Sequence, residues 1–375
     1  MTTAYDQKRA RYLLPVIALA LTPLAPVLAD DASVTMQAGH EAHLRADGHA
    51  PIGIMGDHLH KKGEWMLSYR YMHMDMDGSR IGTKKVSPQT IATTVPNRFF
   101  GQPMQPPTLR IVPLWMTMDM HMLGAMYAPT NDLTLMAMAN YIDKEMNHIT
   151  FQGGVGTTVQ GFFTTNSEGF GDTRITALYR LYKDSVHKAH LNLGLSLPTG
   201  SITERDSILT PMGTRPDVRL PYAMQLGTGT FDLLPGLTYT GRVADFSWGG
   251  QFRSEVRLGG KNDEGYTWGD LYAVTGWLAY EWAPWISTSM RLDAWTQDSI
   301  SGIDSNIVGP VQTANPDFYG GEQVFAYFGA NMVGQTGIIR GHRFAFEVGV
   351  PLYRDLNGPQ LETDWNVMVG WQKAF

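Results

Sequence analysis

Apolar and polar residues alternate one by one through most of this chain. Between Ala189 and Leu197 every second residue is alanine or leucine, and the residues between them are His, Asn, Gly and Ser. The last eleven residues, Trp365 to Phe375, alternate in the same way and end on an aromatic residue. A period of two indicates a β-strand with different surroundings on its two faces. Aromatic strand ends are typical of strands that span a membrane.

Twelve segments of this kind follow one another, separated by turn residues. They lie at about 64–76, 115–127, 133–141, 172–181, 189–197, 230–240, 246–258, 268–282, 286–295, 323–333, 343–353 and 365–375. Short and long connections alternate between them, as in bacterial barrels with short periplasmic turns and long outer loops. The sequence therefore predicts an all-β protein, an antiparallel transmembrane β-barrel of about 12 strands over residues 64–375, with ten or fourteen strands as alternatives.

Composition agrees with a barrel better than with a helical membrane protein. After residue 30 no apolar run approaches the roughly 20 residues that a spanning helix requires. Mean hydropathy is −0.18, yet 11% of residues are aromatic and 40 are glycine. The chain has no cysteine, so no disulfide stabilises it, and sheet closure must do so. The net charge of −6 argues against a nucleic-acid partner.

The N-terminus predicts export. Lys8, Arg9 and Arg11 precede an apolar run at 13–28, which ends in a small-residue cleavage site at Ala29. Residues 1–29 are therefore predicted to be a cleaved signal peptide. The alternative, a membrane-anchoring helix, is disfavoured because three prolines interrupt the run.

Residues 30–63 form a separate segment with no strand or helix pattern. The segment is rich in histidine: His40, His43, His49, His58 and His60. Three interpretations remain open, namely a flexible periplasmic tail, a short plug, and an arm that collects metal ions.

Charged residues fall on the predicted inward faces of the strands. These residues are Arg174, Arg180, Arg253, Glu255, Arg257, Arg291 and Asp293. Charges inside a barrel must be paired or hydrated, because burying an isolated charge is costly. They are predicted to line the lumen, either as a salt-bridge network that fills it or as a lining that selects substrates.

Methionines are concentrated in the first strands. The chain has 21, and they are phased: Met72, Met74 and Met76 share one face of the first strand, and Met116, Met118 and Met120 share one face of the second. Consecutive strands are usually neighbours, so the two rows should lie side by side and inward, near the outer mouth of the barrel. By alternation, His73 and His121 point the other way.

Thioether sulfur and imidazole both suit copper. The candidate metal ligands are therefore Met72, Met74, Met76, Met116, Met118, Met120, His73, His121, His58 and His60. Methionine is also a flexible apolar residue that lines promiscuous binding surfaces, and it packs well in cores. Soft-metal binding, an apolar substrate path and simple packing all remain open.

The sequence favours no enzyme and requires no cofactor. It has no phosphate-binding glycine loop and no His-Glu-x-x-His spacing. His190 and Ser196 share a face, but six residues of strand separate them by roughly 20 Å, which is too far for a catalytic pair.

Three motifs carry a family resemblance. The stretch Leu191–Gly200 (LNLGLSLPTG), the strand entry Gly169–Thr173 and the C-terminal Gly370–Phe375 resemble motifs of an outer-membrane transporter family named after the meta-pathway of phenol degradation. The resemblance implies a barrel that moves small hydrophobic compounds. The methionine-rich strands are also similar, in composition only, to methionine-rich outer-membrane copper-resistance barrels.

The sequence thus predicts a channel or transporter of the bacterial outer membrane for small solutes. Copper or another soft metal ion is the leading specific substrate. The alternatives are a pore for small aromatic or hydrophobic compounds and a closed structural or adhesive barrel. The predicted partners are outer-membrane lipids, the outer-membrane assembly machinery, and a small-molecule or metal-ion substrate.

Overall fold

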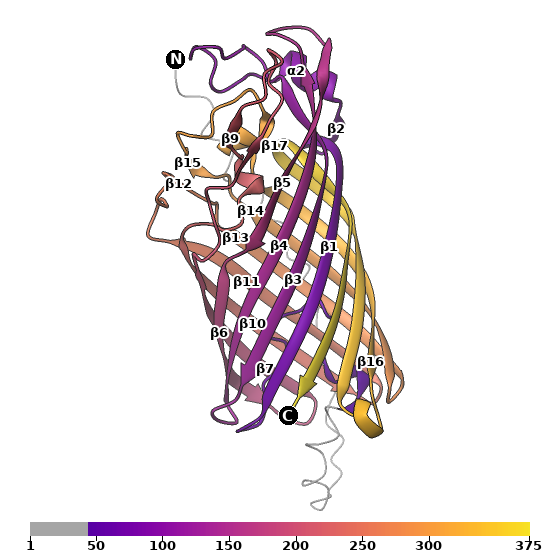
Figure 1. The fold of residues 1–375 in the computed structure, drawn as a ribbon. Coiled ribbons are helices and arrows are strands. Elements are labelled where there is room, and N and C mark those ends of the chain that lie inside the picture. The colour runs from indigo at the N-terminus through magenta and orange to yellow at the C-terminus, as the bar shows by residue number, and fades with distance from the viewer. Residues whose placement is uncertain (1–43) are drawn as a thin grey trace, which may run out of the picture. The chain divides into compact units, whose positions relative to one another are not determined.

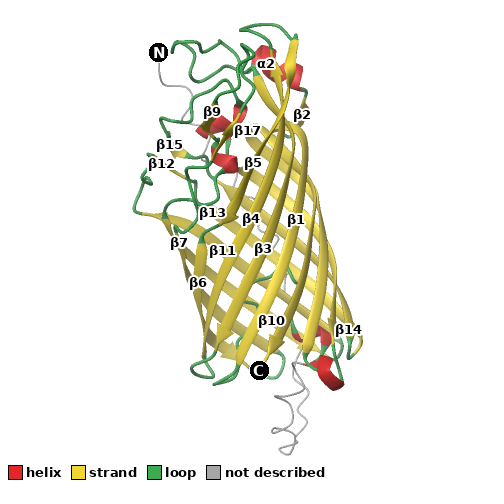
Figure 2. Ribbon diagram, in the orientation of Figure 1, coloured by secondary structure: helices red, strands yellow, loops and turns green. Residues whose placement is uncertain are grey.

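The computed structural model describes residues 44–375, in which one antiparallel sheet closes on itself (Figures 1 and 2). The predicted signal peptide, His40 and His43 lie outside the described residues. The elements of the closed ring are β1 (Trp65–Gly82), β3 (Ile111–Tyr127), β4 (Leu133–Phe151), β6 (Thr173–Lys183), β7 (His187–Leu197), β10 (Phe231–Val243), β11 (Phe246–Leu258), β13 (Leu271–Ala283), β14 (Ile286–Gln297), β16 (Gly321–Val333) and β17 (His342–Ala374). Each pairs with the next, and β17 pairs with β1 to close the ring.

The last element folds back on itself. The first part of β17 pairs with β16 as far as Leu356, and the second part pairs with β1 as far as Ala374. Trp371 Nε1 donates to His342 Nδ1 at 2.9 Å, so the two parts lie side by side. The predicted strands at 343–353 and 365–375 are therefore the two arms of one element. The ring therefore has eleven elements rather than twelve separate strands, because the last element runs along the barrel wall twice, once in each direction.

The wall between residues 147 and 170 differs from the prediction. The sequence pattern leaves residues 142–171 as a connection between two predicted strands, which is wrong, because β4 continues to Phe151 and β5 (Val159–Phe170) pairs with its upper half. β6 pairs with the lower half of β4, from Leu133 to Met138. The sequence hides β5 because a strand that has polar residues on both faces shows no apolar alternation.

The two faces of the wall differ as the alternation predicts. On β7, Leu191 and Leu193 are 40% and 51% exposed on the outside, whereas Asn192 and Ser196 are 8% and 2% exposed on the inside. Aromatic side chains gather outside near both ends of the strands. Trp65 stacks on Tyr127 at the short-turn end, and Tyr141 contacts Phe170 toward the other end. Two aromatic girdles flanking an apolar band are the usual surface of a membrane barrel.

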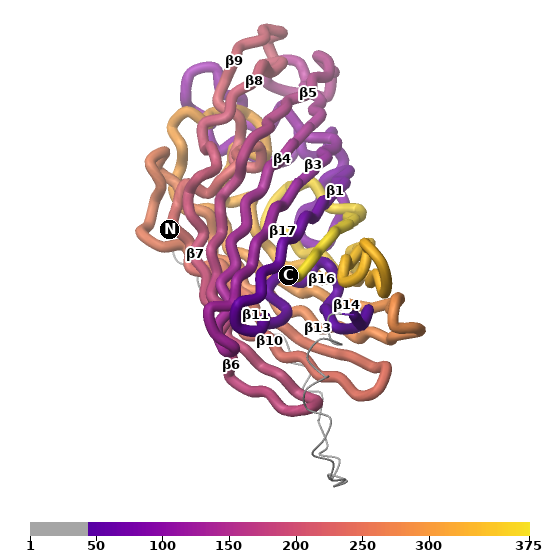
Figure 3. Tube along the Cα trace, turned by 60° about the horizontal axis from the view of Figure 1, so that its bottom comes forward, coloured from indigo at the N-terminus to yellow at the C-terminus, as the bar shows by residue number. Residues whose placement is uncertain are grey.

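Short turns gather at the end that carries the C-terminus, and long loops at the opposite end (Figures 1 and 3). The loops hold helix α2 (Pro88–Thr94) and the small strands β2 (Lys84–Val86), β8 (Arg205–Ser207), β9 (Asp217–Arg219), β12 (Tyr266–Thr267) and β15 (Ser301–Gly302). Short 3-10 turns are η2 (Ala46–Gly48), η3 (Tyr222–Met224), η4 (Gln312–Ala314), η5 (Pro316–Phe318) and η6 (Gly337–Ile339). Within residues 44–375, the structure has no helix with the length and apolar character to cross a membrane.

Two of the sequence motifs meet at the base of these loops. The Asp172 carboxylate accepts from Gly200 N at 2.9 Å and from Thr228 N at 2.8 Å. Thr199 Oγ1 accepts from Thr173 N at 2.8 Å. The motifs at 169–173 and 191–200 are therefore hydrogen-bonded to each other, and together they anchor the loop between β7 and β10.

Candidate functional site

Residues 44–60, called the plug below, lie against the inner wall of the barrel. Side chains of the wall donate hydrogen bonds to plug carbonyls: His190 Nε2 to Gly56 O, Gln251 Nε2 to Met55 O, Asn331 Nδ2 to His49 O, Ser287 Oγ to Ala46 O and Arg70 Nη2 to Ile54 O, at 2.8 to 3.3 Å. A buried segment without regular structure needs such partners for its backbone. The described part of the histidine-rich segment is thus an internal plug.

The plug backbone lies tightly against two charged side chains of the wall at Gly53. Its N–H donates to Glu347 Oε2 at 3.0 Å. A Cβ at this position would lie 2.4 Å from the same oxygen and 2.5 Å from Arg291 Nη2. A larger residue would have to displace these two side-chain ends, whereas glycine lets the wall carboxylate bind the plug backbone directly.

The inward charges form ion pairs along the wall opposite the methionines. Arg174 pairs with Glu255 at 2.8 Å, Arg253 with Asp293 at 2.9 Å, Arg257 with Asp232 at 2.6 Å and Arg291 with Glu347 at 2.8 Å. Arg180 stands apart from this network, at the short-turn end, 3.3 Å from Asp132. Six of the seven predicted lining residues therefore belong to this charged network, which consists of two groups: Arg257 also lies 3.3 Å from Glu255 in one, and Arg291 lies 3.8 Å from Asp293 in the other. Sequence reasoning missed its partners Asp232 and Glu347.

A cavity of about 300 Å³ lies between the plug, this network and the methionines. Its methionines are Met55, Met72, Met74, Met136, Met138 and Met368. Its charged side comprises Arg174, Arg253, Glu255, Arg291, Asp293 and Glu347. The lumen cavity is thus apolar on one side and ionic on the other.

The two methionine rows lie side by side on the inner faces of β1 and β3, as predicted. The register pairs Met72 with Met120, Met74 with Met118 and Met76 with Met116. At the loop end of this ladder, Met76 and Met116 pack with Met146 of β4 and with Leu220 and Met224 of the loop after β9. The rows continue inside the barrel from the lumen cavity up to the loops.

A second, larger cavity lies among the loops. Its volume is about 510 Å³, and most of its lining is apolar: Ile111, Phe163, Ile208, Met212, Leu220, Ile307 and Val311 are examples. Leu220 is fully buried and also packs on Met116 and Met146. Leu220 therefore contacts both the loop cavity and the loop end of the methionine ladder.

The histidines of the proposed metal set are not brought to the methionines. His73 Nδ1 lies 2.7 Å from Asp119 Oδ1, and His121 Nδ1 lies 2.8 Å from the Tyr69 hydroxyl, all on the outer face of the wall. The strands do not bend enough to turn these residues inward. The ten candidate ligands fall into three separate groups: the inner ladder, the outer face, and the plug with His58 and His60.

The plug contains a grouping that the sequence did not reveal. His58 Nδ1 lies 2.8 Å from Asp57 Oδ1, and His49 Nδ1 lies 3.9 Å from Asp57 Oδ2. Asp57 could not be predicted as a ligand from the sequence, because residues 30–63 show no periodic pattern from which neighbours in space could be inferred. Among the described residues this is the one cluster of three or more histidine or acidic side chains with metal-ligand spacing.

Comparison with known proteins finds no matching family model and no matching curated protein. Among solved structures, the chain is similar to an outer-membrane channel from Pseudomonas putida F1, at 15% identity and a TM-score of 0.54, over 86% of this chain and 99% of that one. It is also similar to the Ralstonia pickettii toluene transporter TbuX, at 11% identity and a TM-score of 0.44, over 90% and 94% of the two chains. The KdgM porin matches at 11% identity and a TM-score of 0.36, over 82% and 99%.

The first of these similarities shows a shared fold. The protein is a closed β-barrel of the bacterial outer membrane, as its aromatic girdles and apolar band also indicate. The short-turn end is then periplasmic and the loop end extracellular. The solved neighbours named above are channels, transporters or porins rather than enzymes.

Proposed function

We propose that the protein is an uptake channel for small apolar molecules of about the size of one aromatic ring. The observation that carries this proposal is a row of apolar contacts between two cavities: Leu220 lines the extracellular cavity and packs on Met116, and the methionine ladder leads from there to Met74 and Met72, which line the lumen cavity. This row is called the apolar path below. The resemblance of the sequence motifs to phenol-pathway transporters agrees with this substrate class.

Size supports this class of substrate. A dry cavity of about 150 Å³ is enough to bind benzene. The extracellular cavity, at about 510 Å³, and the lumen cavity, at about 300 Å³, each exceed that volume. Ligand pockets of this kind are lined mainly by apolar side chains with a few polar groups, which describes the extracellular cavity, whereas the lumen cavity is apolar on its methionine side only.

Methionine suits such a path for a physical reason. Its side chain is unbranched and polarisable, and it adapts to ligands of different shape. The ladder pairs can therefore move aside as a guest passes, which stiff β-branched side chains would resist. The plug lies at the periplasmic end of the path, since Gly53 and Met55 line the lumen cavity and His49 and Asp57 line a separate cavity below it.

A soft metal ion is the second candidate substrate. The observation in its favour is the set of facing pairs Met72–Met120, Met74–Met118 and Met76–Met116, because paired thioethers suit Cu(I). Weak sites in sequence would also suit conduction. The top of the ladder, however, packs against leucines, as expected for an apolar path.

One pair of substitutions tests the apolar path. Gly154 lines the extracellular cavity, and a Cβ added there would have no neighbour closer than 3.8 Å. Gly154→Trp should fill the cavity and reduce uptake of radiolabelled toluene into proteoliposomes at least fivefold. Gly154→Ala, the matched control, should leave uptake unchanged. Equal uptake by the Trp variant and the parent would refute the path.

Replacing the six ladder methionines by leucine separates the two substrates. An apolar path should keep toluene uptake within about twofold, since leucine conserves size and polarity. A thioether path should lose Cu(I) uptake completely. Cu(I) uptake that is present in the parent and abolished in this variant, together with no toluene uptake in either, would favour the metal.

A further inference from the structure

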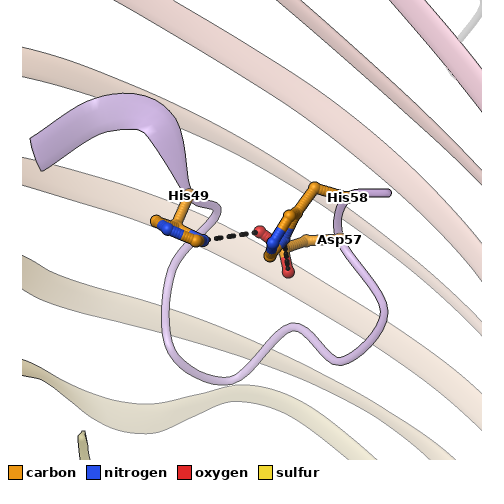
Figure 4. A group of neighbouring side chains, drawn as sticks. All are labelled: His49, Asp57 and His58. Carbon is orange, nitrogen blue, oxygen red and sulfur yellow. Dashed lines mark hydrogen bonds and ion pairs between the residues drawn. The ribbon is translucent and has the colours of Figure 1, made fainter. Parts of the chain in front are cut away.

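Three side chains of the plug that can bind a metal converge on one point. They are His49, Asp57 and His58, and one ligand atom of each lies within 4.8 Å of the other two. In Figure 4 dashed lines join the Asp57 carboxylate to both imidazole rings, with His49 on one side of the group and the carboxylate and His58 ring together on the other. The ring of His49 meets the ring of His58 edge-on, with centroids 4.5 Å apart.

The wall holds both ends of this loop in place. Asn331 Nδ2 donates to His49 O, and His190 Nε2 donates to Gly56 O at 2.8 Å. Within the loop, Ala50 N donates to Asp57 Oδ2 at 2.9 Å, and Gly56 adopts a φ of +63° that favours glycine. The ligand set is therefore assembled by the fold before any ion arrives.

Asp57 is the anionic member of the set. Burial alone would raise the pKa of its carboxyl group, but the neighbouring His58 and His49 rings and Arg343 act the other way. The result is a carboxyl pKa well below its ordinary value. The ionised carboxylate is the form that binds a metal ion.

The set is reached from the periplasmic side. His49, Asp57 and His58 all line a cavity of about 130 Å³, together with Lys183, Lys188 and Arg242. Their positive charges repel a metal ion, so electrostatic attraction alone would not hold an ion in this cavity. They also leave imidazole coordination as the main attraction, which selects Zn²⁺, Ni²⁺ or Cu²⁺ over Mg²⁺ or Ca²⁺.

We propose that His49, Asp57 and His58 bind one divalent transition-metal ion, which joins the two ends of the 49–58 loop and fixes the plug. Zn²⁺ lies about 2.0 to 2.2 Å from imidazole nitrogen and carboxylate oxygen. Tetrahedral ligand atoms are then about 3.4 Å apart. The observed separations of 2.8 and 3.9 Å bracket this value, so small side-chain rotations complete the site. The ion replaces the proton that His58 and Asp57 share.

This site is independent of the apolar path, because no ladder methionine belongs to it. The test uses the mature protein in detergent, without a polyhistidine tag and after EDTA treatment, titrated calorimetrically with ZnCl₂. The parent should bind one equivalent, and excess Mg²⁺ should not compete. His49→Gln, His58→Gln and Asp57→Asn should each weaken binding at least tenfold.

The matched control is His187→Gln, since His187 lies at a periplasmic turn and bonds only the Tyr239 hydroxyl through its ring Nδ1, at 2.8 Å. It should bind Zn²⁺ as the parent does. Co²⁺ substitution gives a second readout, a visible ligand-field band that the His49→Gln variant should lose while its barrel stays folded, as heat-modifiable gel mobility shows. No binding by the parent, or parental affinity in the His49→Gln/His58→Gln double variant, overturns the proposal.

Discussion

The ion pair between Arg291 and Glu347 gives the sharpest quantitative prediction. Arg291 Nε and Nη2 donate to the two Glu347 oxygens at 2.8 and 3.0 Å, and the two side chains are only 6% and 1% exposed. Arg291 also lies 3.7 Å above the Tyr327 ring, and Glu347 accepts from Gly53 N of the plug. This pair therefore connects the wall to the plug.

Replacing Arg291 by methionine should destabilise the barrel strongly. It leaves a buried carboxylate without its partner, which costs about 3–5 kcal/mol. The Arg291→Met/Glu347→Gln double variant removes both charges, keeps an acceptor for Gly53 N, and should recover most of that loss. Arg205→Met is the contrast: Arg205 pairs with Asp217 at 2.7 Å, but the pair is 53% and 64% exposed. Its loss should cost less than about 1 kcal/mol.

Reversible urea unfolding in lipid vesicles, followed by tryptophan fluorescence, measures all three variants. The predicted order of unfolding free energy is parent and Arg205→Met highest, the double variant next, and Arg291→Met lowest. If Arg291→Met and Arg205→Met lose the same amount, burial does not determine the strength of these pairs. If the double variant is no better than the single one, the isolated charge is not the cause.

Three further predictions concern the wall, the loops and the plug. Gly349→Val should abolish folding, since a Cβ there lies 2.2 Å from Tyr327 Cε1, whereas Gly276→Ala, with nothing nearer than 3.8 Å, should fold normally on heat-modifiability gels. Asp172→Ala should cost about 1–3 kcal/mol by orphaning two loop N–H groups, and limited proteolysis should then cut within residues 198–230 faster than in the parent. Deleting residues 44–60 should give steady single-channel current in planar bilayers where the parent gives little; no increase would show that the plug does not limit passage.

The strands were predictable because lipid and lumen impose opposite chemistry on their two faces. The segment from Ala189 to Leu197 is the clearest case, since its leucines are exposed outside and its polar residues are buried inside. Where that contrast ends, prediction fails. β5 extends the wall beyond the aromatic girdle to which Tyr141 and Phe170 belong. Its Thr and Asn residues do not alternate with apolar residues.

The candidate site was predictable only in part, for a related reason. Alternation indicates which residues share a face, so the two methionine rows could be placed side by side, whereas the register that pairs their members could not be predicted. It does not indicate what lies across the lumen. The position of the plug in the barrel could therefore not be predicted. The contact between Gly53 and Glu347 and the grouping of His49 with Asp57 could not be predicted either. The chemistry of methionine also left two substrates open, because a thioether serves an apolar guest and a soft metal ion equally well.

Bromobenzene offers the most direct test of the apolar path, since bromine scatters anomalously and marks where an aromatic guest rests. Crystals of the protein soaked with it should show bromine in the extracellular cavity near Phe163, Ile208 and Leu220, and in the lumen cavity beside Met72 and Met74. Gly154→Trp crystals should lose the first of these positions. Bromine found only on the lipid-facing surface of the barrel would contradict an apolar route through the lumen.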